Sequence, residues 1–302
     1  LQVPYETLND AVRTRDKNAV LRLISNGTDP NELSKEGLHP LYVALSVDDV
    51  EIVGILLSAG ADTEATLPDD FVEQLVKSAR EGSEESLAWI RQHGVSTVDE
   101  FLARREISEL HSASHATTPL ITASGNGQLE FVRLFLEHGA KTEARATGGF
   151  TPMHMAAIQG HPAVIRTLIE RGARIDSLND NKETPLTVAS AWGRLEVVQT
   201  LLEAGANPTL SGESGFTAVE SAALNGQTAV LRALSARGVD INTRGLGGAT
   251  PIYMASMNGH TDSVRFLLEP GADPNAPTDS GLTPLHRAAS DGRDDVGKAL
   301  LD

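Results

Sequence analysis

The sequence contains no cysteine, few aromatic residues and fewer basic than acidic side chains. The lack of cysteine excludes disulfides, thiolate metal sites and cysteine nucleophiles, and is compatible with a reducing cytosol. Aromatic residues make up only 4% of the chain, whereas Ala, Leu and Gly are plentiful, which suits close helix packing better than a β-sandwich or barrel. No run of about 18 apolar residues predicts a membrane span, and no signal peptide is evident. We therefore expect a cytoplasmic protein, with the nucleus as the alternative location.

The excess of acidic over basic residues limits which classes of molecule can be partners. The chain has 25 basic and 41 acidic residues, and its formal net charge is -16. An acidic surface repels phosphate groups, which argues against nucleic acid and against anionic membranes as partners. The composition therefore favours a protein partner, in particular one with a basic segment.

Two series of glycines recur with one period. From residue 127 onward both series advance in steps of 33 residues, and a single earlier step of 45 indicates an insertion of 12 residues. Repetition at such a period is typical of solenoid proteins, and we count nine repeats, the last incomplete. The first series is Gly127, Gly160, Gly193, Gly226, Gly259 and Gly292, and the second is Gly27, Gly60, Gly94, Gly139, Gly172, Gly205, Gly238 and Gly271.

Each repeat predicts a pair of helices, and the fifth repeat shows this best. Thr151 can cap a helix N-terminus, and Pro152 suits the first helical position because its missing N–H is not needed there. Ala156 and Ala157 are small enough for a neighbouring helix to approach, and Gly160 can adopt the left-handed conformation that ends a helix. A second apolar stripe with helical spacing follows at Val164, Ile165, Leu168 and Ile169.

These segments resemble the ankyrin repeat, whose signature is Thr-Pro-Leu-His-x-Ala-Ala. The resemblance spans Thr7 to Asp302 and implies an all-α solenoid of helix-turn-helix units joined by β-turn or hairpin loops. The seventh repeat departs from the signature, since Ala218 and Glu220 replace its Pro and His, and the first and third repeats lack it. The matching segments are Thr118-Pro119-Leu120, Thr151-Pro152-Met153-His154, Thr184-Pro185-Leu186, Thr250-Pro251-Ile252 and Thr283-Pro284-Leu285-His286.

The insertion divides the repeats into two groups. Residues 1–96 hold repeats 1 to 3, of which the third is degenerate, and residues 118–302 hold repeats 4 to 9. The segment 97–117 between them begins with capping-box spacing at Thr97 and Glu100, which predicts a short extra helix or a lengthened helix pair. It is either a hinge or contact site, or a surface insertion without a function. Because the last repeat is truncated, we expect the chain to be a fragment of a longer protein.

No catalytic or cofactor-binding motif is evident. The sequence has neither a His-Glu-x-x-His motif nor a phosphate-binding glycine-rich loop with lysine, and the segment 212–216 has Phe216 where a nucleophile elbow needs glycine. Repeat or helix positions explain five of the nine histidines. We therefore predict no enzyme activity, no metal and no cofactor. The remaining histidines, which show no ligand spacing, are His39, His93, His111 and His115.

The resemblance to ankyrin repeats also implies a binding surface. In that fold the turn tips and first helices line a concave face, and variable residues before Thr-Pro and before the helix-ending glycine carry recognition. Large apolar residues are frequent at these positions here, which favours a contact surface; the alternative is that they pack as peripheral core. The predicted contact residues are Phe150, Ile158, Gln159, Glu183, Trp192, Phe216, Leu224, Asn225, Leu246, Met257, Asn258, Leu282 and Asp291, with Ala191 and Ser290 at equivalent positions.

The function expected from this surface is that of a scaffold or adaptor that binds a partner protein through the concave face. The alternative is a recognition or regulatory arm of a larger multidomain enzyme or signalling protein, whose catalytic domain would lie outside these residues. The sequence does not fix the oligomeric state.

Overall fold

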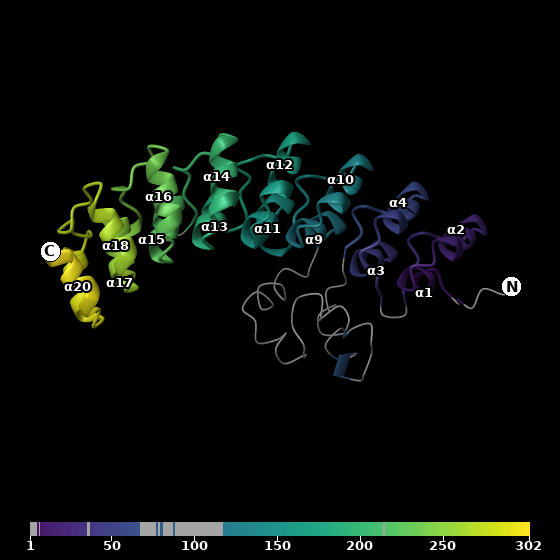
Figure 1. Ribbon diagram of the computed structural model, residues 1–302, viewed down its shortest axis with the longest axis horizontal. Coiled ribbons are helices and arrows are strands. Elements are labelled where there is room, and N and C mark those ends of the chain that lie inside the picture. Colours follow the sequence, from purple (N-terminus) through teal and green to yellow (C-terminus); the bar gives the residue numbers. More distant parts are fainter. Residues whose placement is uncertain are drawn as a thin grey trace. The chain divides into compact units, whose positions relative to one another are not determined.

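The computed structural model describes residues 5, 7–34, 37–66, 77, 79, 80, 87, 117–213 and 215–302. Every regular element among these residues is a helix (Figure 1), which confirms the predicted all-α class. The chain divides into two compact units, Leu1–Pro152 and Met153–Asp302, which we call the N-terminal and the C-terminal unit. Most of the third predicted repeat and nearly all of the segment 97–117 lie outside the described residues, so a hinge at that segment stays a prediction.

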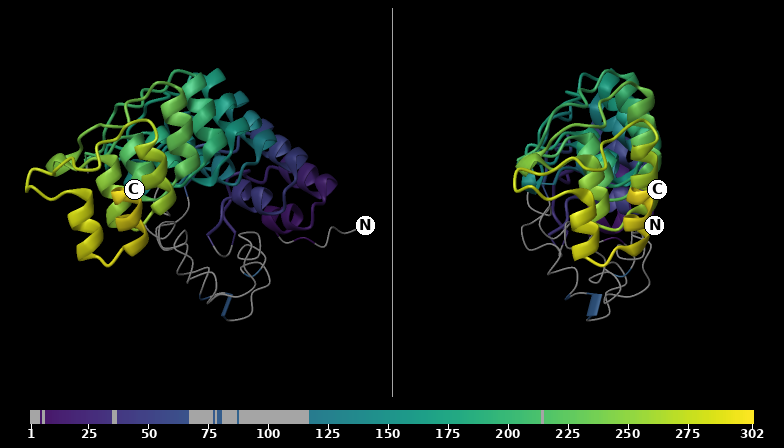
Figure 2. Two further views of the ribbon diagram at one scale, coloured as in Figure 1. Left: turned by 60° about the vertical axis from the view of Figure 1, so that its left-hand side comes forward. Right: turned by 90° about the vertical axis from the view of Figure 1, so that its left-hand side faces the viewer.

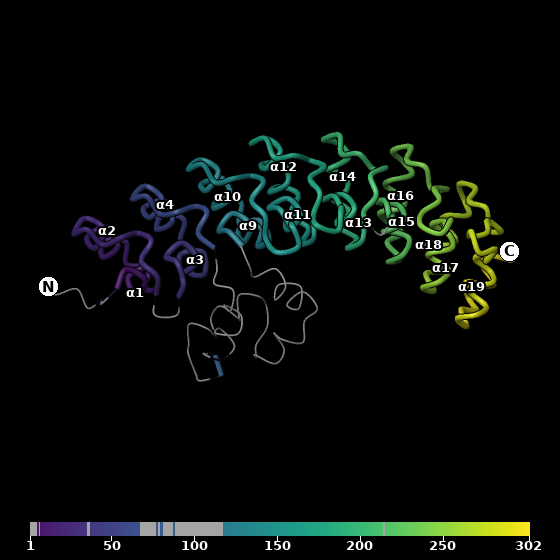
Figure 3. Tube along the Cα trace, turned by 180° about the vertical axis from the view of Figure 1, so that it is seen from behind, coloured from purple at the N-terminus to yellow at the C-terminus, as the bar shows by residue number. Residues whose placement is uncertain are grey.

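In the N-terminal unit, the described helices form three pairs that stack side by side. The first helices pack in the order α1, α3, α9, and the second helices pack in the order α2, α4, α10 (Figure 3). The bounds are α1 Leu8–Arg13, α2 Lys17–Ser25, α3 Pro40–Ser46, α4 Val50–Ser58, α9 Pro119–Gly125 and α10 Leu129–Glu137, followed by the 3-10 helix η1 Thr147–Gly149.

The second helix pair packs directly against the pair α9–α10, although 60 residues separate them in the sequence. The Gln128 side chain joins the two pairs, since its Nε2 lies 3.4 Å from the carbonyl oxygen of Leu45. The N–H of Lys141 donates to the carboxylate of Glu64 at 3.0 Å. The fourth predicted repeat is therefore a direct neighbour of the second.

The C-terminal unit contains five helix pairs in two rows (Figure 1). First helices pack on first helices from α13 to α19, and second helices pack on second helices from α12 to α20. The bounds are α11 Pro152–Gln159, α12 Pro162–Glu170, α13 Pro185–Ala191, α14 Leu195–Glu203, α15 Ala218–Leu224, α16 Thr228–Ala236, α17 Pro251–Met257, α18 Thr261–Leu268, α19 Pro284–Ser290 and α20 Asp294–Leu301, with the 3-10 helix η2 at Leu246–Gly248.

The core runs between the two rows as a repeated layer of aliphatic side chains. Leu186 on α13 and Leu201 on α14 are both fully buried, and the equivalent positions of the next repeat hold Val219 and Leu234. Alanine at Ala222 is fully buried as well, and its small side chain lets the adjacent first helices approach. Because each helix pair covers the apolar side of the next, stability in such a fold depends mainly on contacts between neighbouring repeats.

The helix ends follow the capping chemistry that the sequence predicts. The Thr184 hydroxyl accepts the N–H of Thr187 at 3.1 Å, and Pro185 occupies the first position of α13. From α9 onward, the glycine after each first helix has a positive φ, for example +68° at Gly193, whereas Arg15 and Asp48 hold this position after α1 and α3. The positive φ favours glycine at Gly193, and a Cβ there would in addition displace the side-chain amide of Gln227 from the next repeat.

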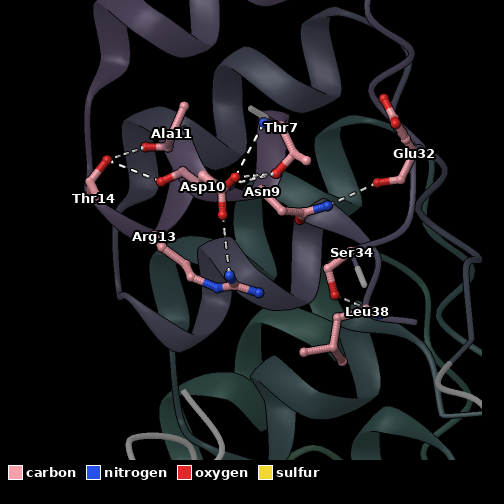
Figure 4. Close-up of polar contacts among 9 residues, drawn as sticks. All are labelled: Thr7, Asn9, Asp10, Ala11, Arg13, Thr14, Glu32, Ser34 and Leu38. Atoms are coloured by element: carbon pink, nitrogen blue, oxygen red, sulfur yellow. Dashed lines mark hydrogen bonds and ion pairs between the residues drawn. The ribbon is translucent and has the colours of Figure 1, made fainter. Parts of the chain in front are cut away.

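Two repeats that depart from the signature still cap their first helices. Thr7 and Asp10 form a capping box on α1, and Asn9 donates to the carbonyl oxygen of Glu32 at 2.9 Å (Figure 4). In the seventh repeat, Glu220 accepts the N–H of Thr217 at 2.7 Å and so completes the same kind of box on α15. The capping box therefore replaces the Thr-Pro start of the signature at these two helices.

Candidate protein-binding surface

Four short hairpins of the C-terminal unit lie on one side of its helices (Figure 2). Each hairpin is closed by a backbone hydrogen bond between its first N–H and the carbonyl oxygen four residues later, with lengths of 2.8 to 3.2 Å. We call this set the hairpin row, and its described members are residues 179–183, 212–213, 215–216, 245–249 and 278–282.

Backbone bonds also join neighbouring hairpins in pairs. The N–H of Glu213 donates to the carbonyl oxygen of Asn181 at 2.7 Å, and the N–H of Asp279 donates to that of Gly247 at 2.8 Å. Arg244 braces the second pair, because its guanidinium donates to the carbonyl oxygen of Pro277 at 2.7 Å and lies 3.8 Å from the Asp279 carboxylate. The hairpin row is thus held by main-chain contacts that do not depend on the identity of its exposed side chains.

The hairpin row presents two leucines to solvent. Leu246 is 70% exposed and Leu282 is 43% exposed, and only six large apolar side chains in the described residues are exposed. Phe216 and Glu183 of the same row are half-buried.

The ends of the first helices form a second group of predicted contact residues, which we call the helix-end row. Trp192, Leu224 and Met257 are half-buried at the ends of α13, α15 and α17. Ile158 differs, because it is only 8% exposed and belongs to the core. Its inclusion among the accessible residues is therefore corrected, and the role of the other members stays a prediction.

The polar members of the helix-end row make contacts within the protein. Asn258 donates to the carbonyl oxygen of Leu224 at 2.6 Å, and Asn225 donates to that of Ser221 at 2.9 Å. Both asparagines are nevertheless exposed, whereas Gln159 and Asp291 are half-buried and Asp291 pairs with Arg287 at 2.9 Å. These contacts fix the asparagine side chains in place before any partner binds.

The residue that follows each helix-ending glycine joins successive repeats, a role that was not predicted from the sequence. Arg194 donates from Nε to the carbonyl oxygen of Ile158 at 2.6 Å, and Gln227 donates to that of Ala191 at 3.3 Å. His260 contacts the same carbonyl position of the repeat before it at 3.1 Å. Arginine, glutamine and histidine all carry a nitrogen donor on a long side chain. Their recurrence directly after the glycine is the sequence feature from which this contact between repeats could have been predicted.

Electrostatically, the hairpin row is acidic toward its N-terminal end. Asp180 and Glu213 are exposed, and the half-buried Glu183 accepts a hydrogen bond from the Asn179 amide at 2.9 Å. Lys182 is the exposed cation among them. The arginine of the next hairpin pair is already matched by Asp279, so the row as a whole favours a cationic group over an anionic one.

Phe150 is a further predicted contact residue, but it belongs to the N-terminal unit and so to neither row. It is half-buried, and its ring lies over Gly148, where an added Cβ would come within 2.9 Å of the ring. Gly148 has a φ of +75° in the 3-10 helix η1. The hairpin before α11 thus uses glycine to make room for the aromatic ring.

The described residues offer no assembled site for metal chemistry. No group of three or more His, Asp or Glu side chains in this part of the chain could hold a metal ion. His154, which the signature places next to the start of α11, is buried and contacts the carbonyl oxygen of Glu183 at 3.0 Å. No helix of the described ranges combines the length and apolar character that crossing a bilayer requires.

Comparison with known families agrees with this geometry. The family model for ankyrin repeats, described as three copies, matches residues 87–179, 143–212, 172–245 and 221–302. No curated protein matches the chain. The family matches together extend over residues 87–302, which is more than half of the sequence. The chain belongs to the ankyrin-repeat family.

Proposed function

We propose that this protein is an interaction scaffold that binds a partner protein through the hairpin row and the helix-end row of the C-terminal unit. Ankyrin repeats are in general protein-interaction modules and typically lack catalytic activity. The observation that carries the proposal is the exposure of Leu246 and Leu282 on hairpins that backbone hydrogen bonds hold in place. A surface fixed in this way loses little conformational entropy when a partner binds.

The chemistry of the surface supports an apolar partner segment with a basic end. Phe216 of the seventh repeat and Leu246 and Met257 of the eighth would contact its apolar residues, while Trp192 offers the side-chain type most enriched at energetic hot spots. Asp180 and Glu213 would face the basic end. The net charge of -16 weighs against nucleic acid and acidic membranes as the occupant, and we place the interaction in the cytoplasm or nucleus.

A peptide-display selection tests the proposal and does not require the partner to be identified. Peptides selected from a random library on the intact chain are retested by fluorescence polarisation against the variants Leu246→Ser and Trp192→Ala. We expect each variant to weaken binding about five- to thirtyfold, which corresponds to about 1–2 kcal/mol. Peptides rich in Lys and Arg should in addition lose affinity for Glu213→Lys.

The matched control is Leu301→Ser, because Leu301 is 73% exposed on α20 and lies outside both rows. This variant should bind the selected peptides as the unchanged chain does. Equal loss in the Leu301 and Leu246 variants, or no loss in the Leu246 and Trp192 variants, would show that the peptides use another surface and would refute the assignment.

A further inference from the structure

One repeat of the N-terminal unit caps its first helix with a histidine. His39 stands at the N-cap of α3 and is followed by Pro40, in the place where the other capped first helices of the described repeats have threonine. His39 has no metal-ligand spacing to the other histidines of the sequence. Its function as a helix cap was not predicted from the sequence. Threonine cannot change its charge near neutral pH, whereas histidine can.

Both ring nitrogens of His39 are engaged. Nδ1 accepts the N–H of Leu41 at 3.2 Å, which satisfies one of the free donors in the first turn of α3. Nε2 lies 2.9 Å from Oδ1 of Asn31 in the preceding repeat. These two contacts require a neutral ring with its proton on Nε2, since an N–H donor faces Nδ1.

The orientation of the Asn31 amide is fixed independently. Its Nδ2 donates to Asp29 at 3.1 Å, and its Oδ1 accepts the N–H of Asp62 at 2.7 Å in addition to the His39 bond. A flipped amide would place a donor against the Asp62 N–H and lose the bond to the Asp29 carboxylate. Asn31 therefore presents an acceptor to His39, and the tautomer follows from the network.

We propose that His39 makes the start of α3 an acid-sensitive element, because its cap on the N–H of Leu41 exists only while the imidazole is neutral. A proton on Nδ1 would set a donor against the Leu41 N–H and abolish the cap. The charged groups that face the ring across the described elements are Asp29 from the α2–α3 connection and Asp62 from the segment after α4. Both carboxylates favour protonation, but burial opposes it.

The direction of the pH effect follows from this balance. Burial lowers the pKa of His39 below 6.5, and the negative charges of Asp62 and Asp29 offset part of that decrease. A base whose folded-state pKa is depressed contributes its full stability above pH 6.5 and loses it as the pH falls toward the folded-state pKa. Acid thus weakens this cap, and the loss begins just below neutrality.

Hydrogen exchange tests the proposal on the intact chain. Protection factors for the first turn of α3 should fall between pH 7.5 and 5.5 by as much as about tenfold, since opening takes up one proton and each pH unit is then worth up to a factor of ten. The variant His39→Thr carries the cap of the other repeats and should show no such fall. An equal fall in both proteins would overturn the proposal.

A second measurement does not depend on the variant folding. Long-range ¹H–¹⁵N spectra of the unchanged chain should show His39 as the Nε2–H tautomer, with a titration midpoint below 6.5. Asp62→Asn should move that midpoint further down, because it removes a charge that favours the imidazolium while keeping an oxygen for the N–H of Glu64. An Nδ1–H tautomer, or a midpoint at or above 6.5, would exclude the acid-sensitive cap.

Discussion

The two units place a tyrosine at the same position of the ankyrin signature and use it differently. Tyr42 in α3 and Tyr253 in α17 both occur three residues after the capping residue, where the signature has histidine. Tyr42 is buried, and its hydroxyl lies within hydrogen-bond distance of two carbonyl oxygens, those of Ala65, at 3.0 Å, and of Thr117, so that one proton serves both. Tyr253 is half-buried, and its hydroxyl forms no hydrogen bond to another residue of the described ranges.

The difference shows what the signature histidine contributes. In α11 the buried His154 donates from Nε2 to the carbonyl oxygen of Glu183 in the next repeat. Tyr42 supplies the same donor with another side chain, whereas Glu220 reverses the polarity and accepts the hydroxyl proton of Thr243 at 2.6 Å. At three repeats this position thus makes a polar contact to the following connection, through histidine, tyrosine or glutamate, whereas Tyr253 shows that a repeat can fold without it.

The largest effect is expected from truncating the core of either unit. Leu56 on α4 and Leu201 on α14 are both fully buried, so Leu56→Ala and Leu201→Ala should each lower the free energy of unfolding by about 2–5 kcal/mol. Because contacts in a repeat stack are local, hydrogen exchange should place the first loss around α4 and the second around α14. Uniform loss of protection along the whole chain in both variants would contradict a stack of separately stabilised repeats.

Replacing the two tyrosines by phenylalanine should have a smaller effect on the free energy of unfolding, and the effect should differ between the two positions. Tyr42→Phe removes the buried hydroxyl that faces the carbonyl oxygens of Ala65 and Thr117 and should cost about 1–2 kcal/mol in urea unfolding. Tyr253→Phe removes a hydroxyl that bonds to no described residue and serves as the matched control, with an expected change within about 0.5 kcal/mol. Equal effects of the two substitutions would mean that burial of the ring, and not the hydroxyl contact, distinguishes the two positions.

The stability that Tyr42 contributes should change in a known direction as the pH rises into the alkaline range. Burial raises the pKa of Tyr42 well above 10, and the nearby Glu64 adds to the increase. The neutral phenol therefore contributes stability that is present below pH 10 and is lost as the pH rises toward the folded-state pKa. Tyr42→Phe should abolish that alkaline loss, which urea titrations at pH 8 and pH 10.5 can detect.

The sequence was sufficient for the local structure and insufficient for which repeats are neighbours. Thr-Pro pairs and the glycine period predicted the helices of the C-terminal unit, because caps and turns depend on a few adjacent residues. The contact of α3–α4 with α9–α10 was not predicted, since no local pattern shows which repeat covers Leu56. For the same reason the sequence placed Ile158 on the surface and gave His39 no role, as burial and the Asn31 contact both depend on stacking.

The smallest effect concerns an exposed ion pair of the N-terminal unit. Lys17 at the start of α2 lies 2.5 Å from Glu51 and 3.8 Å from Asp49, on the adjacent α4. The hydrogen bond to Glu51 raises the pKa of Lys17, so any stability from the pair is present below pH 10.5 and is lost as the pH rises through the folded-state pKa. Solvent and salt screen such contacts, however, because the pair lies at the surface and the Glu51 side chain is 74% exposed.

We therefore expect Glu51→Gln to leave the urea midpoint unchanged at pH 7 in 0.15 M salt, in contrast to Tyr42→Phe in the neighbouring helix. Asp49 also accepts the N–H of Ile52 at 3.1 Å, so Asp49→Ala should destabilise α4 through its lost cap even though its ion pair is longer. A Glu51→Gln effect as large as that of Asp49→Ala would show that the ion pair, and not the cap, stabilises α4 against α2.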